Sequence, residues 1–361
     1  MPRTKASEAT PFFERLCPGT TWRGSCVLAI VAPVALMLAS PARAESVEEF
    51  YRGKSITLVI GYSVGGGYDL YGRLLARHLG KYIPGQPSVV PQNREGAGSL
   101  RAALYLYGAA PKDGTVIGTF SRSMSVAPLL TDAQFDATKF TWIGSISTDV
   151  NVCMTWGASP IKTWNDMLTR PFTMGGLGAG ADPDMFALMF KNVFGAKLKL
   201  VTGYPGTNDV ALAMERGEVD GMCGLSWSTV KTRHLDWVTA KKVNIPVQAG
   251  LTKEAEIPDV PVVTDFVKGE EQMQIVRLIL ASQEMARPFV APPGIPEDRK
   301  RALIDAFLKT MKDPEFLAEA QKMKADVNPV SAGEIDRLLA DVYKTPKDVV
   351  AKAATAITNR P

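Results

Sequence analysis

Residues 55–69 read Ser55-Ile-Thr-Leu-Val-Ile-Gly-Tyr-Ser-Val-Gly-Gly-Gly-Tyr-Asp69 and continue into Leu70–Leu79, where apolar residues recur at helical spacing. An apolar run, a glycine turn and an amphipathic segment predict a strand, a loop and a helix in that order. The pattern recurs at 172–194, where a short apolar run precedes the glycine-rich stretch 175–182 and an apolar segment. Such alternation predicts an α/β fold with mainly parallel sheets flanked by helices.

The same alternation extends through most of the chain. Further strands are expected at 88–93, 115–120, 150–156, 198–202 and 219–225, and C-terminal helices near 265–281, 297–311, 314–324 and 331–344. Because the pattern restarts near 150, we expect a second unit, 150–246, inserted into a first unit made of 45–149 and 247–361. The C-terminal helices are expected to pack across both units.

The first 44 residues have a different composition. Basic residues up to Arg23 are followed by an apolar run of about 13 residues from Val27 to Ala39 and then by Ala42-Arg-Ala44, the layout of a secretory signal peptide. A bilayer-spanning helix needs about 20 apolar residues, so a signal anchor is the less favoured alternative. We therefore expect cleavage near Ala44-Glu45 and a mature protein in the periplasm.

The charge is concentrated in this leader. It holds five basic and two acidic side chains, which is +3 of the formal charge of +4, so the other 317 residues carry only +1. A nearly neutral body has no basic footprint for nucleic acid, and we expect no nucleic-acid partner.

Cysteine and histidine are scarce after residue 44. Cys153 and Cys223 lie 70 residues apart in apolar runs, so a disulfide and two buried thiols are both open; we expect the thiols. His78 and His234 share no short spacing with other ligand-type residues. We expect neither a metal site nor a cofactor.

The two glycine loops are candidate anion sites. A glycine turn that opens a helix presents unpaired backbone N–H groups at the positive end of the helix dipole, which suits a carboxylate or phosphate. Ligands of open α/β sheets bind at the carboxyl ends of strands, where both loops lie. Two matched loops predict a ligand held between two units, whereas the alternative is that the glycines only make tight turns.

Polar residues after other strands are further candidates, each with a plain structural alternative. Ser121 and Arg122 follow the strand at 115–120, and Arg122 could pair with a ligand carboxylate or remain a solvated surface residue. Similar reasoning applies to Tyr204, Thr207, Ser226 and Trp227. Asp69 is expected to act as an N-cap that orders the first loop.

Three enzyme motifs compete for the same residues. Gly61-Tyr-Ser-Val-Gly65 fits G-x-S-x-G, but the only histidines available as a base are His78 and His234. The segment 176–181 fits a dinucleotide fingerprint without the acidic residue that should follow, and 67–73 lacks the Lys-Ser/Thr pair of a phosphate-binding loop. A serine hydrolase using Ser63 is retained as the alternative function.

The order and spacing of short motifs along nearly the whole mature chain resemble the extracytoplasmic solute receptors of tripartite tricarboxylate transporters, the Bug-type receptors. The landmarks are Gly65-Gly-Gly-Tyr-Asp69, Asn93-Arg-Glu-Gly-Ala-Gly98, Pro111-Lys-Asp-Gly114, Gly178-Ala-Gly180, Tyr204-Pro-Gly206, Gly217-Glu-Val-Asp220, Ile257-Pro-Asp-Val-Pro261 and Ala291-Pro-Pro-Gly-Ile-Pro296.

The resemblance implies a two-lobed periplasmic binding protein of the Venus flytrap type, type II, acting without catalysis. It would capture a small organic carboxylate, aliphatic or aromatic, and deliver it to a membrane permease. A monomer is expected, and use of the receptor in signalling is an open alternative. The expected ligand-binding residues are Tyr62, Ser63, Gly65, Gly66, Gly67, Tyr68, Asp69, Ser121, Arg122, Gly178, Ala179, Gly180, Ala181, Tyr204, Thr207, Ser226 and Trp227.

The chain departs from the family pattern at two of these positions. Ala181 stands where the family commonly has Ser or Thr, and Tyr68 where it often has Thr, so two hydroxyl groups of the usual kind are missing. The pair Tyr62 and Tyr68 suggests an aromatic or amphipathic ligand.

Overall fold

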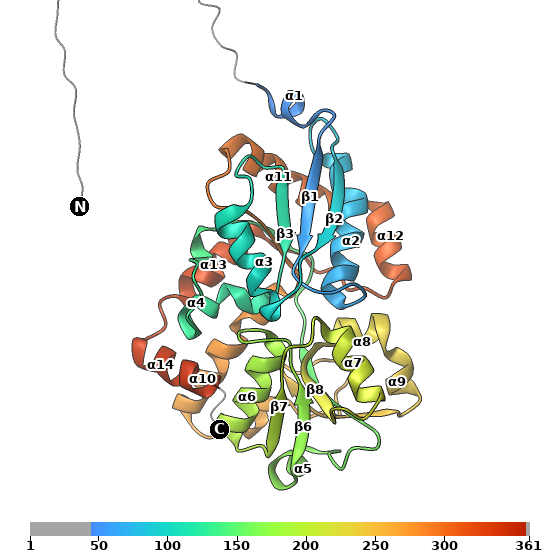
Figure 1. Ribbon diagram of the computed structural model, residues 1–361, viewed down its shortest axis with the longest axis vertical. Helices are drawn as coiled ribbons and strands as arrows, with labels where there is room; N and C mark the ends of the chain where they lie inside the picture. The colour runs from blue at the N-terminus through green and yellow to red at the C-terminus, as the bar shows by residue number, and fades with distance from the viewer. Residues whose placement is uncertain (1–44, 359–361) are drawn as a thin grey trace, which may run out of the picture. The chain divides into compact units, whose positions relative to one another are not determined.

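The expected strand at 55–60 lies inside a six-stranded sheet that organises the first lobe (Figure 1). The computed structural model describes residues 45–358, so the expected signal peptide lies outside the described residues. Three of the strands run parallel, with β1 between β2 and β3, while β10 is antiparallel to β3 and β4. The strand order is β11 (Val330–Ser331), β4 (Thr141–Ser145), β10 (Pro288–Ala291), β3 (Val116–Thr119), β1 (Ser55–Ile60) and β2 (Ser88–Asn93).

Helices cover both faces of this first sheet because its strands are apolar on both sides; β3, for example, is buried throughout. One face packs against α2 (Gly67–Leu79), α11 (Glu297–Thr310) and α12 (Pro314–Lys322), with the short α1 (Val47–Tyr51) at its edge. The other face packs against α3 (Leu100–Leu104), which continues as a π-helical turn to Ala109, and against α4 (Ala127–Leu130) and α13 (Ala332–Val342).

The second lobe is built on a five-stranded sheet. Its order is β7 (Leu198–Val201), β6 (Phe172–Gly175), β8 (Gly221–Ser226), β5 (Asn151–Trp156) and β9 (Val243–Ala249), with β6, β7 and β8 parallel and β5 antiparallel to both neighbours. One face is covered by α6 (Asp182–Phe194), α10 (Glu270–Leu280) and α14 (Lys347–Ala356). The other face is covered by α7 (Thr207–Glu215), α8 (Trp227–Arg233) and α9 (Leu235–Thr239). A short helix, α5 (Trp164–Thr169), precedes β6.

The chain passes between the lobes at three places: after β4 through residues 146–150, after α10 through 281–287, and between α13 and α14 through 343–346. Strand β9 belongs to the second sheet as far as Ala249, three residues beyond the expected limit of 246. Helix α14 packs on α6 and α10 and also on α4 of the first lobe. These connections place the carboxyl ends of β1 and β3 opposite those of β6 and β8.

The predicted two-lobed α/β fold is confirmed. The strand β10 was missed because Pro288–Ala291 is short, lies between prolines and runs against its neighbours, so no helix-strand alternation marks it. Helix α14 was also missed. Among the helices of 45–358, none is long and apolar enough to cross a membrane.

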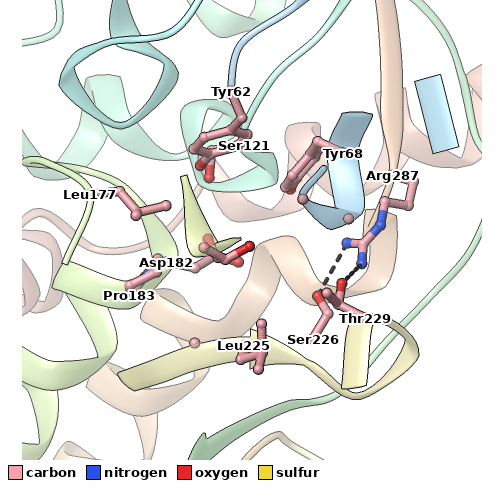
Figure 2. A pocket seen from close by; sticks show the side chains of 14 residues that line it. Tyr62, Tyr68, Ser121, Leu177, Asp182, Pro183, Leu225, Ser226, Thr229 and Arg287 are labelled. Carbon is pink, nitrogen blue, oxygen red and sulfur yellow. Dashed lines mark hydrogen bonds between the residues drawn. The ribbon is translucent and has the colours of Figure 1, made fainter. Parts of the chain in front are cut away.

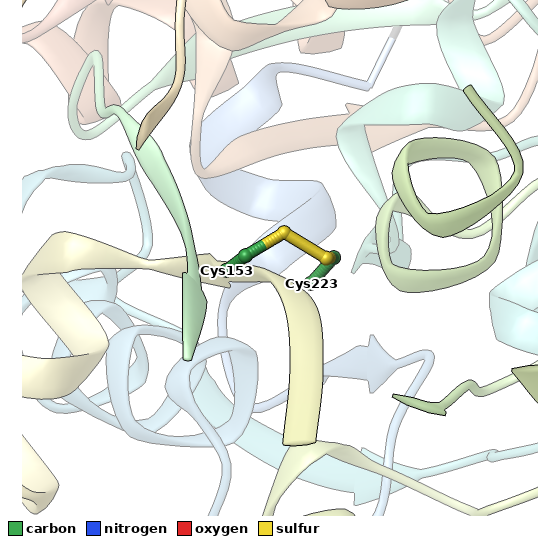
Figure 3. The surroundings of a disulfide bond; sticks show 2 residues. All are labelled: Cys153 and Cys223. Carbon is green, nitrogen blue, oxygen red and sulfur yellow. A yellow bond between two sulfur atoms is a disulfide. The ribbon is translucent and has the colours of Figure 1, made fainter. Parts of the chain in front are cut away.

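Cys153 and Cys223 form a disulfide, so the expectation of two free thiols was wrong (Figure 3). Cys153 lies on β5 and Cys223 on the adjacent β8, and both are fully buried. The register of the two strands shifts between Val152 and Met154, which brings the two cysteines side by side. Sequence spacing alone could not reveal which strands become neighbours.

Candidate ligand-binding site between the lobes

A small cavity lies where the strand ends of the two lobes meet (Figure 2). Its volume is about 30 Å³, enough for about two water molecules by the usual allowance of 10–15 Å³ each. The lobes are therefore closed on each other in this structure. The lining residues are Tyr62, Gly66, Gly67, Tyr68, Ser121, Leu177, Asp182, Pro183, Thr207, Gly224, Leu225, Ser226, Thr229 and Arg287.

The first glycine loop opens helix α2 at the cavity. Gly66 is the N-cap and makes no side-chain cap, so the N–H groups of the first turn have no intrahelical partner. Asp69 was predicted to be the N-cap, but it lies in the first turn of α2 and Gly66 is the N-cap; Asp69 does order the loop, as expected. Its carboxylate accepts from the Gly65 N–H at 3.0 Å and is held by Arg73 and Asn93, each at 2.9 Å.

Gly67 has no room for a side chain. A Cβ built there would lie 2.3 Å from the hydroxyl of Thr229 and 3.2 Å from Nη2 of Arg287. The start of α2 is thus packed directly against the polar groups of the opposite wall. A larger side chain here would fill the cavity.

Arg287 supplies a buried cation to the cavity wall and was not predicted. Its Nη1 donates to Ser226 at 3.1 Å, and its Nη2 donates to Ser228 at 2.9 Å and to Thr229 at 3.0 Å. The carboxylate of Asp149 lies 3.5 Å from Nη2. Arg287 lies immediately before β10, a strand that was not predicted from the sequence. An arginine just before a short apolar run is the feature of the sequence that could have pointed to it.

Arg122 joins the two lobes. Its guanidinium is fully buried and its Nε donates to Asp182, at the start of α6, at 2.6 Å. Burial opposes the charge of Arg122, yet the adjacent Asp182 carboxylate leaves its pKa raised. Arg122 therefore has a protein carboxylate as its partner in the closed arrangement and does not line the cavity.

The second glycine loop makes different contacts from the first. The N–H groups of Leu177 and Gly178 donate to the carboxylate of Asp184 at 2.5 and 2.9 Å, so a side chain in the first turn of α6 already uses them. A Cβ on Gly178 would lie 2.7 Å from the backbone N of Gly98, in the first lobe. This loop closes against the opposite lobe and contributes its flanks, not its glycines, to the cavity.

Two tyrosines form an aromatic wall. The rings of Tyr62 and Tyr68 lie with their centroids 5.0 Å apart. Burial raises the pKa of both phenols above its ordinary value, so both remain neutral hydrogen-bonding groups. The hydroxyl of Tyr68 accepts from the N–H of Arg122 at 2.8 Å.

The structure brings together one part of the predicted site residues. Those at the cavity are Tyr62, Gly66, Gly67, Tyr68, Ser121, Thr207 and Ser226. Those outside its lining are Ser63, Gly65, Asp69, Arg122, Gly178, Ala179, Gly180, Ala181, Tyr204 and Trp227. The residues that sequence reasoning missed are Leu177, Asp182, Pro183, Gly224, Leu225, Thr229 and Arg287.

The surroundings of Ser63 differ from those of a hydrolase nucleophile. Its hydroxyl donates to Asp209 of the second lobe at 2.7 Å. His78 lies against Glu319 at 2.7 Å, and the His234 ring lies 4.2 Å from that of Trp237. Both histidines thus have structural partners away from Ser63.

His234 gives the protein a pH-dependent stability. Burial, with a smaller contribution from Arg233, lowers its pKa to about 4, below the ordinary value of about 6.5. The unfolded chain binds the proton more tightly, so stability is full above pH 6.5 and falls as the pH drops toward 4. Between neutral and acidic pH the wild-type free energy of unfolding should fall by up to about 3 kcal/mol more than that of His234→Gln. Urea unfolding of both proteins at pH 4.5 and 7.5 measures this difference. If both proteins lose the same free energy of unfolding at pH 4.5, the assignment to His234 is contradicted.

Comparisons with known proteins agree with this architecture. Residues 72–354 match the family model described as "Tripartite tricarboxylate transporter family receptor". The "UPF0065 protein in gbd 5'region" of Cupriavidus necator is 25% identical over 336 residues, 90% of this chain and 95% of that protein.

Three solved structures share the fold. The periplasmic binding protein BugD has a TM-score of 0.65 at 22% identity, over 84% of this chain and 97% of its own. MatC from Rhodopseudomonas palustris, with bound malate, has a TM-score of 0.66 at 17% identity, over 82% of this chain and 99% of MatC. R. palustris Rpa4515, with adipate, has a TM-score of 0.66 at 20% identity, over 84% of this chain and 98% of Rpa4515.

The family match covers more than half of the chain and confirms the resemblance drawn from the motifs. It describes a solute-binding receptor and not an enzyme, so the hydrolase alternative is set aside. The protein belongs to the tripartite tricarboxylate transporter family of receptors.

Proposed function

We propose that this protein is a periplasmic receptor that captures a small organic carboxylate between its lobes and delivers it to a membrane permease of the tripartite tricarboxylate type. The observation that carries the proposal is the meeting of the α2 N-terminus and Arg287 at one cavity. Export, action as a monomer and delivery to the permease are part of the proposal and rest on the family and on the signal-like leader.

The chemistry of the cavity suits a carboxylate. The N–H groups at Gly66 and Gly67 lie at the positive end of a 13-residue helix, which favours a negative group. Arg287 and the hydroxyls of Ser226 and Thr229 add charged and neutral donors from the opposite side. Apolar side chains, among them Leu225, complete the wall and favour a ligand with a hydrocarbon part.

Binding requires the lobes to part. A cavity of about 30 Å³ has room for water but not for an organic acid. The segments 146–150, 281–287 and 343–346 that connect the lobes are where a hinge would bend. A ligand that binds better to an expanded cleft than to the closed one would shift the population accordingly.

A thermal-shift screen tests the proposal. The purified protein is heated with a panel of aliphatic and aromatic mono- and dicarboxylates, and with uncharged amides of the same acids as controls. A ligand at about 100 times its dissociation constant should stabilise the protein by roughly 2.7 kcal/mol. A rise with at least one acid and none with its amide is the expected result. If no acid in the panel raises the melting temperature, the proposed function is contradicted.

A further inference from the structure

We infer that Asp182 selects carboxylate ligands that also carry a hydrogen-bond donor, an ammonium or hydroxyl group, over ligands with a second carboxylate. The inference rests on the proposed function and names the ligand class of the same cavity. It makes Asp182 a specificity-determining residue, which neither the motifs nor the family pattern assigned.

The first observation is an unused acceptor in the cavity wall. Asp182 is 5% exposed, and its Oδ2 accepts from Arg122 at 2.6 Å and from Asn151 at 3.2 Å. Its Oδ1 is buried and has no hydrogen-bond partner among residues 45–358. Figure 2 shows this carboxylate pointing into the space that the labelled side chains enclose.

A buried carboxylate oxygen without a donor is unfavourable, and a ligand can supply the donor. Native proteins leave few buried polar atoms unsatisfied, and those that remain often mark a functional site. A ligand ammonium or hydroxyl at Oδ1 would make a charge-assisted hydrogen bond, which is stronger than one between neutral groups. Oδ1 therefore favours a donor and has no attraction for an acceptor.

The second observation is that the buried charges of the cleft are already balanced. Arg122 pairs with Asp182, and Arg287 lies 3.5 Å from Asp149. All four side chains are at most 7% exposed. One ligand carboxylate can be held by the α2 N-terminus and Arg287, but a second would meet Asp182 at short range without a free cation. Two negative charges close together in a buried site repel each other, which disfavours a dicarboxylate ligand.

Matched ligands test the inference by calorimetric titration. The first set varies the α-substituent of propionate: propionate itself, lactate, alanine and methylmalonate. The second set adds a phenyl ring to the methyl group of each: 3-phenylpropionate, 3-phenyllactate, phenylalanine and benzylmalonate. In at least one set the hydroxy or amino acid should bind about tenfold more tightly than the unsubstituted acid, with the dicarboxylate weakest. The two donor-bearing members distinguish a hydroxyl from an ammonium ligand.

Two variants separate the role of Asp182 from a general loss of charge. Asp182→Asn should reduce the preference for the donor-bearing acid about tenfold and improve dicarboxylate binding. Asp149→Asn, which also removes a buried carboxylate beside a cleft arginine but lies outside the cavity lining, should shift all affinities and keep their order. If Asp182→Asn does not fold, the order of affinities in the wild-type protein decides.

The outcomes distinguish this inference from the proposed function. Equal binding of donor-bearing acids and dicarboxylates, or an unchanged order in Asp182→Asn, overturns the inference and leaves the carboxylate receptor intact. If no member of either set binds, the inference about Asp182 is also overturned, while the wider thermal-shift panel still decides whether the protein binds carboxylates.

Discussion

Replacing Cys153 and Cys223 together by alanine will lower the free energy of unfolding by about 4 kcal/mol, as loop-closure entropy predicts for a cross-link spanning 70 residues. The bond joins β5 to β8 inside the second lobe, and both side chains are fully buried. The unfolded chain gains conformational freedom when the cross-link is lost, which is the main source of the destabilisation. Urea unfolding with and without dithiothreitol measures the effect.

The reductant provides the control for this prediction. Reduced wild-type protein should approach the stability of the double variant, and the variant itself should not respond to dithiothreitol. A wild-type protein whose stability is insensitive to reduction, with two free thiols by mass spectrometry after alkylation, would refute the disulfide.

Replacing Arg122 by methionine will open the cleft. The substitution leaves Asp182 buried without its cation in the closed arrangement, and breaking a buried ion pair in this way costs about 3–5 kcal/mol. An open arrangement hydrates Asp182 and avoids this cost, so the lobes are expected to separate. The radius of gyration from small-angle X-ray scattering should therefore exceed that of the wild type.

Two further variants sharpen this second prediction. Arg94→Met removes an exposed arginine of the first lobe and should leave the radius of gyration unchanged. The double variant Arg122→Met with Asp182→Leu removes both charges and should return to the closed dimensions. An Arg122→Met protein as closed as the wild type would mean that the other interlobe contacts, such as Ser63 with Asp209, hold the cleft alone.

Much of the fold was predictable because its local signals are strong. The run 55–60 is largely buried and lies between two parallel strands, and Gly67 after it must pack closely against Thr229 and Arg287. Helix, strand and turn signals agree at such places. β10 was harder to predict from the sequence, because this four-residue segment beside prolines gains its strand conformation only by pairing with strands distant in the sequence.

The site was predicted only where it follows from local geometry. The α2 N-terminus and the strand-end residues Ser121 and Ser226 lie at the cavity as expected. Arg287 lies just before β10, whose Val290 pairs with Gly118 of β3, 172 residues earlier in the chain, and nothing in the local pattern shows which sheet this strand joins. The amides of the second glycine loop are taken by Asp184, a contact that depends on the start of α6 and not on the glycines themselves.

The central claim is that a carboxylate binds between the lobes, against the start of α2 and Arg287. Its most direct test is a calorimetric titration of Gly67→Val with the acid that gives the largest thermal shift. The valine side chain would extend toward Thr229 and Arg287, into the space proposed for the ligand carboxylate, and a clash with the ligand of about 1–3 kcal/mol predicts about a tenfold to hundredfold loss of affinity. Gly333→Val, in the first turn of α13 with nothing within 4 Å of its Cβ, should bind like the wild type. Equal affinity of Gly67→Val and the wild-type protein would place the ligand elsewhere and contradict the account.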